Sequence, residues 1–592
     1  MRPSAFAAPT LWLFSTCCLL QAAPPDVKWV FPPGGQIGQK VSVKVSGKIN
    51  QPGTQVWSDN PTFVFEIPEK DNELSITSSA DARPGLYWLR FFNAEGATAQ
   101  MPFVLGRLPE VVEAEPNNEV AKAQAIDQSS VINAKLGAAN DVDVYAVKLK
   151  KGQTLVAQVD ANWRLGFPVD PIMQVLTANG TVLEQVDDDH GFDPMIAFEA
   201  PADGTWLVRV FGFPAAPNST IRFAGGADYL YRLTLTTGPV ANHVQPAAVQ
   251  SGSEAAVKLV GWNLPDTLSQ PIKVDAGSLP GLTHAELPHE VSLTLVDEPV
   301  HVAAEPCNGE KPLAVTVPAT VCGVIDEPGD EDSFRFSAKK GEVLVIASES
   351  RSLGHPLDTV ITVFDKDGKS LGESDDAVRN KADSRLVFSV KADGDYTVRV
   401  RDLFEKGGWR FAYRVSIRPR QPSVKLTLKA DVFKATPGTP LEIPVTIARN
   451  DGFKEEVTIS VQDLPEGATV EPVKSEVKGD TSKAVKLILK TDEAKPFNGP
   501  LRIVGQYGEG SSVSAEFDLT TFKRSTQDVW LTILPKKEDT KPKDAAAEKA
   551  AKENSIMLNF ERRVRRGEKR RGAERLSFPS ASPQRSLRTV LS

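Results

Sequence analysis

The sequence predicts an all-β protein made of tandem β-sandwiches, immunoglobulin-like and jelly-roll-like, followed by a disordered C-terminal tail. Short runs alternate apolar and polar residues, as in Val41-Ser-Val43-Lys-Val45, and this is the period of a half-buried strand. The 44 prolines and 42 glycines are scattered between these runs, where they mark turns. A chain of 592 residues also exceeds the size of a single hydrophobic core. We therefore expect several sandwiches in series.

The first 23 residues resemble an export signal peptide. Arg2 gives a positive start, an apolar stretch runs from Leu11 to Leu20, and Gln21-Ala22-Ala23 ends it with small residues. No later segment reaches the ~20 consecutive apolar residues that a membrane-spanning helix needs. We therefore expect a secreted, periplasmic or cell-surface protein without a transmembrane segment.

Outside a repeated central part, the chain divides by composition. Residues 24–109 and 420–528 carry the alternating pattern and are expected to form immunoglobulin-like β-sandwiches. Residues 240–300 are expected to form a small β linker domain. Residues 529–592 are expected to form a disordered charged tail, because the stretch from Lys536 to Glu553 is rich in Lys, Ala, Glu and Pro and the segment after Glu561 is rich in Arg.

Residues 110–239 and 301–419 repeat one pattern. The first copy opens with Glu113-Ala-Glu115-Pro-Asn117-Asn118 and continues with Asp141-Val-Asp143-Val-Tyr145. The second opens with Glu305-Pro-Cys307-Asn308 and continues with Asp330-Glu-Asp332-Ser-Phe334. The offset between the Asp-x-Asp pairs is 189 residues, 332 minus 143. Two copies of one β-sandwich are predicted.

The order of these motifs resembles the bacterial pre-peptidase C-terminal domain. The shared elements are Glu-x-Glu-Pro-Asn-Asn, Asp-x-Asp followed by an aromatic residue, a Lys-Gly turn and Asp-Gly-x-aromatic. The resemblance implies a jelly-roll-like sandwich that is appended to secreted proteases or occurs alone, where it targets, binds substrate or stabilises. The catalytic part of such proteases lies elsewhere in their chains.

The same resemblance implies calcium as a cofactor, because collagenase members hold calcium between the acidic opening and the Asp-rich strand. Calcium takes six to eight oxygen ligands. The positions that match in the first copy are Glu113, Glu115, Asn117, Asn118, Asp141 and Asp143. The second copy offers fewer charged ligands, namely Glu305, Asn308, Asp330 and Asp332. The alternative is a plain turn with solvated carboxylates.

Two further groups of residues are candidates for a role. Cys17 and Cys18 lie in the expected signal peptide, so Cys307 and Cys322 remain as an even pair in an oxidising compartment, which predicts a disulfide. Large aromatic side chains beside loops form either a ligand-binding patch or part of the core; in the first copy these are Trp163, Phe167, Phe211 and Phe213.

The sequence shows no recognisable catalytic motif. It has neither a zinc-protease histidine pair nor Gly-x-Ser-x-Gly, and a net charge of -8 does not indicate a nucleic-acid partner. We hypothesise a secreted, non-enzymatic binding, adhesion or accessory protein, whose partner is an extracellular polymer, a cell-surface component or another protein. The alternatives are a protease-related enzyme with an unrecognised catalytic region and a purely structural envelope component.

Overall fold

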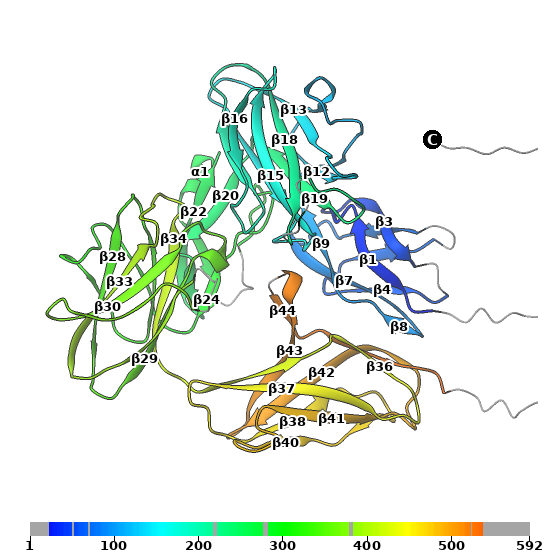
Figure 1. The fold of residues 1–592 in the computed structure, drawn as a ribbon, viewed down its shortest axis with the longest axis vertical. Helices are drawn as coiled ribbons and strands as arrows, with labels where there is room; N and C mark the ends of the chain where they lie inside the picture. Colours follow the sequence, from blue (N-terminus) through cyan, green and yellow to red (C-terminus); the bar gives the residue numbers. More distant parts are fainter. Residues whose placement is uncertain are drawn as a thin grey trace, which may run out of the picture. The chain divides into compact units, whose positions relative to one another are not determined.

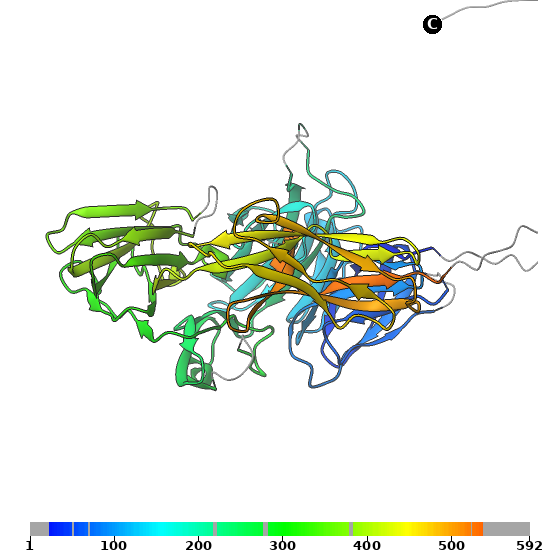
Figure 2. The same cartoon turned by 90° about the horizontal axis from the view of Figure 1, so that it is seen from below.

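Strands dominate the chain, which confirms the predicted fold class (Figures 1 and 2). The computed structural model describes residues 23–49, 52–68, 72–216, 219, 222–275, 282–377, 383–522 and 524–536. Nearly all of the predicted signal peptide and most of the predicted tail lie outside these residues. Within them, the helices are single turns: α1 (Asp266–Ser269), η1 (Val120–Lys122), η2 (Arg351–Leu353) and η3 (Thr520–Phe522). No helix in this part of the chain has the length and apolar character to cross a membrane.

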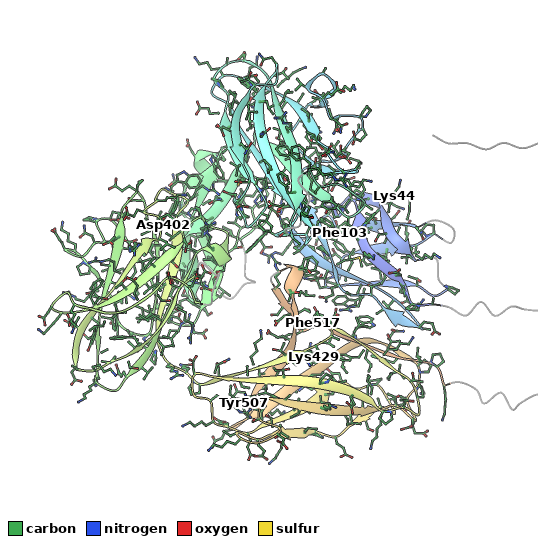
Figure 3. The ribbon with its side chains drawn as sticks, viewed as in Figure 1. Lys44, Phe103, Asp402, Lys429, Tyr507 and Phe517 are labelled. Atoms are coloured by element: carbon green, nitrogen blue, oxygen red, sulfur yellow. The ribbon has the colours of Figure 1, made fainter. Side chains whose placement is uncertain are left out.

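The first sandwich packs two sheets around one core. Their strand orders are β1-β3-β6-β5 and β2-β9-β7-β4, with β8 added beside β7. Alternation explains the packing: Val43 and Val45 are buried against Phe103, while Lys44 between them is exposed (Figure 3). The strands are β1 (Asp26–Phe31), β2 (Gly34–Gln36), β3 (Lys40–Lys48), β4 (Gln55–Ser58), β5 (Val64–Glu66), β6 (Glu73–Thr77), β7 (Gly85–Asn93), β8 (Gly96–Ala97) and β9 (Met101–Gly106).

The two repeated regions share one topology, strand for strand. In the first repeat the sheets are ordered β10-β12-β19-β14-β17 and β11-β13-β18-β15-β16; in the second they are β25-β27-β34-β29-β32 and β26-β28-β33-β30-β31. The strands of the first repeat are β10 (Glu110–Val112), β11 (Gln124–Ile126), β12 (Ser130–Lys135), β13 (Asp143–Leu149), β14 (Thr154–Asp160), β15 (Val169–Thr177), β16 (Val182–Val186), β17 (Met195–Glu199), β18 (Gly204–Pro214) and β19 (Leu230–Thr236). Those of the second are β25 (Val300–Val302), β26 (Leu313–Ala314), β27 (Ala319–Val324), β28 (Glu331–Ala338), β29 (Val343–Glu349), β30 (Thr359–Asp365), β31 (Ser370–Ser374), β32 (Arg385–Ser389), β33 (Gly394–Asp402) and β34 (Ala412–Pro419).

Period-two alternation also builds the core of each repeat. Tyr145, Val147 and Leu149 of β13 point into the first core, and Phe334 and Phe336 of β28 point into the second. The aspartate two residues before the first of these aromatic residues, Asp143 or Asp332, therefore lies at the edge of a core and not on an outer surface. This placement positions the candidate site described below.

Residues 240–296 form smaller sheets, ordered β20-β22-β23 and β21-β24, with a core that includes Val257 and Leu259. The strands are β20 (Val240–Gln245), β21 (Ala248–Gln250), β22 (Glu254–Trp262), β23 (Ile272–Asp275) and β24 (Thr294–Val296).

The last sandwich differs from the expected pair of sheets, because its strands join into one hydrogen-bonded sheet around a single core. Strand β45 pairs with both β36 and β42, and all five of its residues are buried, so the fold continues past residue 528, where we expected it to end. The strands are β35 (Ser423–Leu428), β36 (Val432–Ala435), β37 (Leu441–Asn450), β38 (Val457–Gln462), β39 (Thr469–Val470), β40 (Val473–Ser475), β41 (Ala484–Lys490), β42 (Phe497–Tyr507), β43 (Ser511–Leu519), β44 (Arg524–Thr526) and β45 (Val529–Ile533).

Candidate metal centre

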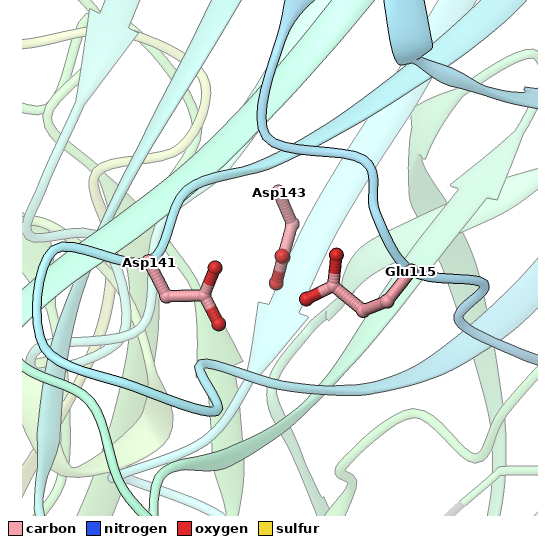
Figure 4. A group of neighbouring side chains, drawn as sticks. All are labelled: Glu115, Asp141 and Asp143. Carbon is pink, nitrogen blue, oxygen red and sulfur yellow. The ribbon is translucent and has the colours of Figure 1, made fainter.

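Three carboxylates meet at the start of strand β13 in the first repeat. Asp143 is the first residue of β13, Asp141 lies two residues before it, and Glu115 lies in the loop after β10. Figure 4 shows the three side chains turned toward a common space, and one oxygen of each lies within 4.8 Å of the others. Asp143 and Asp141 are buried and Glu115 is exposed, so the group opens to solvent on the Glu115 side.

Hydrogen bonds hold the two aspartates in place. Asp141 Oδ2 accepts the Gly137 N–H at 2.5 Å, and its Oδ1 accepts from the Asn118 amide Nδ2 at 2.6 Å. Asp143 Oδ2 accepts from the hydroxyl of Tyr231 at 2.6 Å. Asn118 was predicted as a ligand, but in this contact its amide nitrogen faces the group and orients Asp141.

The fully buried side chain of Asn117 fits the group in two orientations. In one, its NH₂ donates to Glu115 Oε2 and Asp143 Oδ1, both at 3.1 Å. In the other, the amide oxygen occupies that position and faces two carboxylate oxygens. Oxygens about 3 Å apart are neighbours in the shell of a cation that binds its ligands at 2.3–2.6 Å. The second orientation is therefore the one that a bound cation would require.

Burial without a counter-ion changes the acid strength of the group. Burial, reinforced by the Glu113 carboxylate, raises the pKa of Asp143 to about 9. Burial also raises the pKa of Glu113 to about 7. The Oε1 of Glu113 accepts the Lys135 N–H at 2.9 Å, whereas its buried Oε2 has no donor among the described residues. The metal-free pocket thus retains protons at neutral pH, and a divalent cation would replace them.

The second repeat builds a matching group from Glu305, Asp330 and Asp332. Asp330 Oδ2 accepts the Asp326 N–H at 3.2 Å, and Asp332 Oδ2 accepts from the hydroxyl of Tyr413. Burial raises the pKa of Asp332 to about 8. The same three positions and the same tyrosine donor therefore recur.

The second group has fewer oxygen donors than the first. Ala303 stands at the position of Glu113, and Cys307 at that of Asn117. The structure does not bring Asn308 into the group, because its Oδ1 accepts backbone N–H groups of Glu310 and Lys311 in its own loop.

A family model of the bacterial pre-peptidase C-terminal domain matches residues 141–212 and 330–402, so each match begins at the first aspartate of an Asp-x-Asp pair. The chain carries two pre-peptidase C-terminal domains. The first pre-peptidase domain is the first repeat, and the second pre-peptidase domain is the second repeat.

Individual relatives match only parts of the chain. A probable subtilase-type serine protease of Deinococcus radiodurans is 33% identical over 98 residues, which are 16% of this chain and 14% of the protease's length. The pre-peptidase C-terminal domain of a Bacillus anthracis collagenase aligns at 13% identity and a TM-score of 0.15, covering 18% of this chain and 93% of that domain. The SGBP-B protein of a Bacteroides ovatus mixed-linkage glucan utilisation locus aligns at 10% identity and a TM-score of 0.14, covering 67% and 75% of the two chains.

The predicted disulfide between Cys307 and Cys322 is wrong, since both cysteines are free and buried. Cys307 lies in the core of the second pre-peptidase domain, whereas Cys322 on β27 packs outside that core against Ala247, Ala248 and Val296. Val321, its neighbour, points into the core, so alternation places Cys322 on the opposite face of the sheet. Burial raises the pKa of both thiols to about 11.

The four aromatic candidates of the first pre-peptidase domain do not form one exposed patch. Phe167 is part of the core, and Phe211 is buried against Phe223 with ring centroids 4.6 Å apart. Trp163 and Phe213 are partly exposed. Of the two interpretations of these residues, the core therefore applies to Phe167, whereas Phe211 is buried against Phe223 on the face of β18 opposite to Val210, which points into the core.

Sequence reasoning missed the tyrosines that support the acidic groups. Tyr231 on β19 also pairs with the Tyr145 hydroxyl at 2.8 Å, which extends the chain of hydrogen bonds from Asp143 into the core. The signal was present as a repeated Tyr-Arg pair, Tyr231-Arg232 and Tyr413-Arg414. Each Tyr-Arg pair lies far along the chain from the acidic motif of its domain, so the sequence alone did not indicate that the two are in contact.

Proposed function

We propose that this protein is a secreted, non-catalytic accessory protein that binds an extracellular polymer, a cell-surface component or a partner protein. The observation that carries the proposal is the presence of two pre-peptidase domains in a chain whose described residues otherwise form β-sheets. A module that proteases carry as an appendage is repeated here between further sandwiches, which is the arrangement of a multivalent binding protein.

Calcium is the proposed cofactor of the first pre-peptidase domain. Glu115, Asp141 and Asp143 offer carboxylate oxygens, and Asn117 offers an amide oxygen in one of its two orientations. Glu113 lies close enough to raise the pKa of Asp143. Hard oxygen donors of this kind suit calcium, with water completing the shell on the exposed side. The ion would neutralise buried carboxylates and stiffen the loops between β10 and β13.

The similarity to a subtilase-type protease favours one second candidate, a protease-related enzyme. One experiment separates the two functions. The chain starting at Pro24 is incubated with casein and collagen, and in parallel is sedimented with cell-envelope fragments and with insoluble polysaccharides, each in calcium and in chelator. We expect sedimentation that is stronger in calcium and no new peptide fragments. Cleavage of either substrate by freshly purified protein, or no sedimentation with any material, would contradict the proposal.

A further inference from the structure

A cleft of about 380 Å³ adjoins the first pre-peptidase domain, and no residue of the acidic groups described above lines it. Its lining side chains come from both pre-peptidase domains, from residues 240–296 and from the last sandwich. Trp163 and Phe522 give the cleft aromatic surface, and Arg164 and Arg524 give it positive charge. Both aromatic residues are partly exposed. Aromatic walls with a few charged and polar groups are typical of a ligand site.

The loop that carries Trp163 and Arg164 is fixed by a buried carboxylate. Asp193 is 3% exposed, and it accepts the backbone N–H of Ala161 at 3.0 Å, of Asn162 at 2.7 Å and of Trp163 at 3.0 Å. These bonds hold the backbone of the loop before any ligand arrives. A ligand that contacts this loop therefore does not have to order it, which lowers the entropy cost of binding.

Each carboxylate on the wall of the cleft already has partners. Asp160 Oδ2 accepts from Arg164 Nη1 at 3.1 Å, and Glu290 lies 3.7 Å from Arg83. Asp193 accepts the backbone N–H groups of its loop. The acidic residues that line the cleft are therefore engaged with other groups than Arg524.

Among the described residues of the cleft, Arg524 on β44 is the cation left without a carboxylate. Burial and the neighbouring Arg164 guanidinium both lower the pKa of Arg524, and no carboxylate acts in the opposite direction. Its side chain is exposed, so a ligand can reach it. A guanidinium binds an oxyanion through two parallel N–H donors. An anionic group is thus the partner that this arginine lacks.

The other polar groups of the cleft are uncharged. Burial lowers the pKa of His289 to about 4, so its imidazole is neutral at pH 7. Gln158, Asn242 and Ser352 add amide and hydroxyl groups. Neutral donors and acceptors suit the hydroxyl groups of a sugar. The apolar C–H face of a sugar ring also gains from contact with aromatic surface, which a bare inorganic anion does not.

We propose that the cleft binds an acidic saccharide, whose carboxylate or sulfate group pairs with Arg524 while its ring lies against Trp163. The inference rests on the proposed function, because it names the chemical class of the extracellular polymer. The net charge of -8 repels polyanions from the protein as a whole, so the attraction has to be local.

Short sugars test the site by isothermal titration calorimetry on the chain starting at Pro24. The probes are trigalacturonate, which carries carboxylates, sulfated maltotriose, and uncharged maltotriose. We expect at least one acidic trisaccharide to bind at least about tenfold more tightly than maltotriose, since a hydrogen bond to a charged group adds that much. The tighter of the two acidic sugars identifies the anionic group. Failure of both to bind, or equal binding of maltotriose, would overturn the proposal.

Matched variants assign the binding to the cleft. Arg524→Gln should weaken it by about tenfold or more, whereas Arg502→Gln, at an exposed arginine of β42 outside the cleft, should leave it unchanged. The arginine-rich segment after Glu561 is present in every variant, so it contributes equally to all. Undiminished binding by Arg524→Gln would overturn the proposal. Circular dichroism checks the folding of each variant, and Arg524→Glu is a second test of the same charge.

Triglutamate distinguishes an acidic saccharide from an acidic peptide. Trp163→Ala should weaken trisaccharide binding and leave any binding of triglutamate unchanged, because the peptide has no sugar ring to place on the indole. Triglutamate that binds as tightly as the acidic sugars would overturn the proposal in favour of a peptide ligand.

Sedimentation with insoluble polysaccharides separates this inference from the proposed function. Equal sedimentation of the unaltered chain and Arg524→Gln would leave the proposed function intact and count against the cleft. An unaltered chain that binds an acidic trisaccharide but sediments with no material would count against the proposed function and support the cleft.

Discussion

Replacing Asp143 by asparagine should stabilise the metal-free first domain and remove most of the stabilisation that calcium gives to the unaltered domain. Asp143 is completely buried, and burial raises its pKa from 3.8 to about 9. At pH 7 the folded protein therefore holds a proton that the unfolded chain has released. Asparagine has the same shape, needs no proton and still accepts from the Tyr231 hydroxyl, so the substitution removes that cost.

The stability gained in chelator and the calcium stabilisation lost are similar in size, so the variant and the unaltered protein should have similar midpoints in calcium and different midpoints in chelator. Between an unfolded pKa of 3.8 and pH 7 lie about three pH units, each worth about 1.4 kcal/mol, so the substitution gains up to about 4 kcal/mol in chelator. Calcium at a hundred times its dissociation constant stabilises the unaltered domain by about 2.7 kcal/mol. That corresponds to a rise in Tm of about 10 °C for a domain of this size. The variant lacks one ligand and should gain little from calcium.

Differential scanning calorimetry at pH 7, with calcium or with chelator, measures both effects on the full chain. Several transitions are expected from a chain of several domains, and the one that moves with calcium is assigned to the first pre-peptidase domain. Asp332→Asn in the second pre-peptidase domain is the matched control and should leave the calcium shift unchanged. A variant that melts lower than the unaltered protein in chelator, or an unaltered protein without a calcium shift, would refute the reasoning.

Four other predictions follow from described contacts. In chelator, the melting midpoint of the first pre-peptidase domain should fall as pH rises from about 4 to about 9, because the raised pKa of Asp143 makes the folded state bind the extra proton; calcium should flatten this dependence. Tyr231→Phe should lower the free energy of unfolding by about 1–3 kcal/mol in denaturant titrations, since it removes the donor to a buried carboxylate. A thiol assay on the unfolded, unreduced chain starting at Pro24 should find two free thiols, and one disulfide instead would contradict the structure. In the native protein the same two thiols should react slowly, because both are buried. Arg232→Met should destabilise by about 3–5 kcal/mol, because it leaves the largely buried Glu110 carboxylate without its cation and with only the Asn133 amide as a side-chain donor, whereas an unchanged denaturation midpoint would show that this ion pair is dispensable.

Local pattern predicted the strands well, because a sandwich strand must place alternate residues in the core. The acidic group was also predictable, because the Asp-x-Asp pair and the preceding glutamate occur at corresponding positions of both repeats. Of the residues named from the resemblance, the structure gathers Glu115, Asp141 and Asp143 into one group, with Asn117 against it. The Asn118 amide instead donates to the Asp141 carboxylate and orients it. The Asn308 amide oxygen accepts a backbone N–H in its own loop.

The remaining errors concern which side of a sheet a residue faces. Cys322 and Cys307 are fifteen residues apart in the printed sequence, but their separation gives no information about which face of β27 each one contacts. Phe167 and Phe211 are aromatic residues of the kind found in binding patches, but both are buried, and only the packed structure distinguishes a buried aromatic residue from an exposed one. Tyr231 is 88 residues from Asp143, and their contact depends on the pairing of strands that local patterns do not specify.

The shared strand order of the two pre-peptidase domains has a consequence for refolding. Every strand of one domain has a counterpart of the same topology in the other, which is the condition for misassembly by exchange between neighbouring units. The divergence of their interiors opposes such hybrids: β13 carries Tyr145, whose hydroxyl needs Tyr231, whereas β28 carries Phe334 at that position. An exchange of β13 and β28 would place Tyr145 in a core packed around a phenylalanine and Phe334 in a core packed around a tyrosine, so the unequal copies favour self-assembly of each unit over exchange with its neighbour.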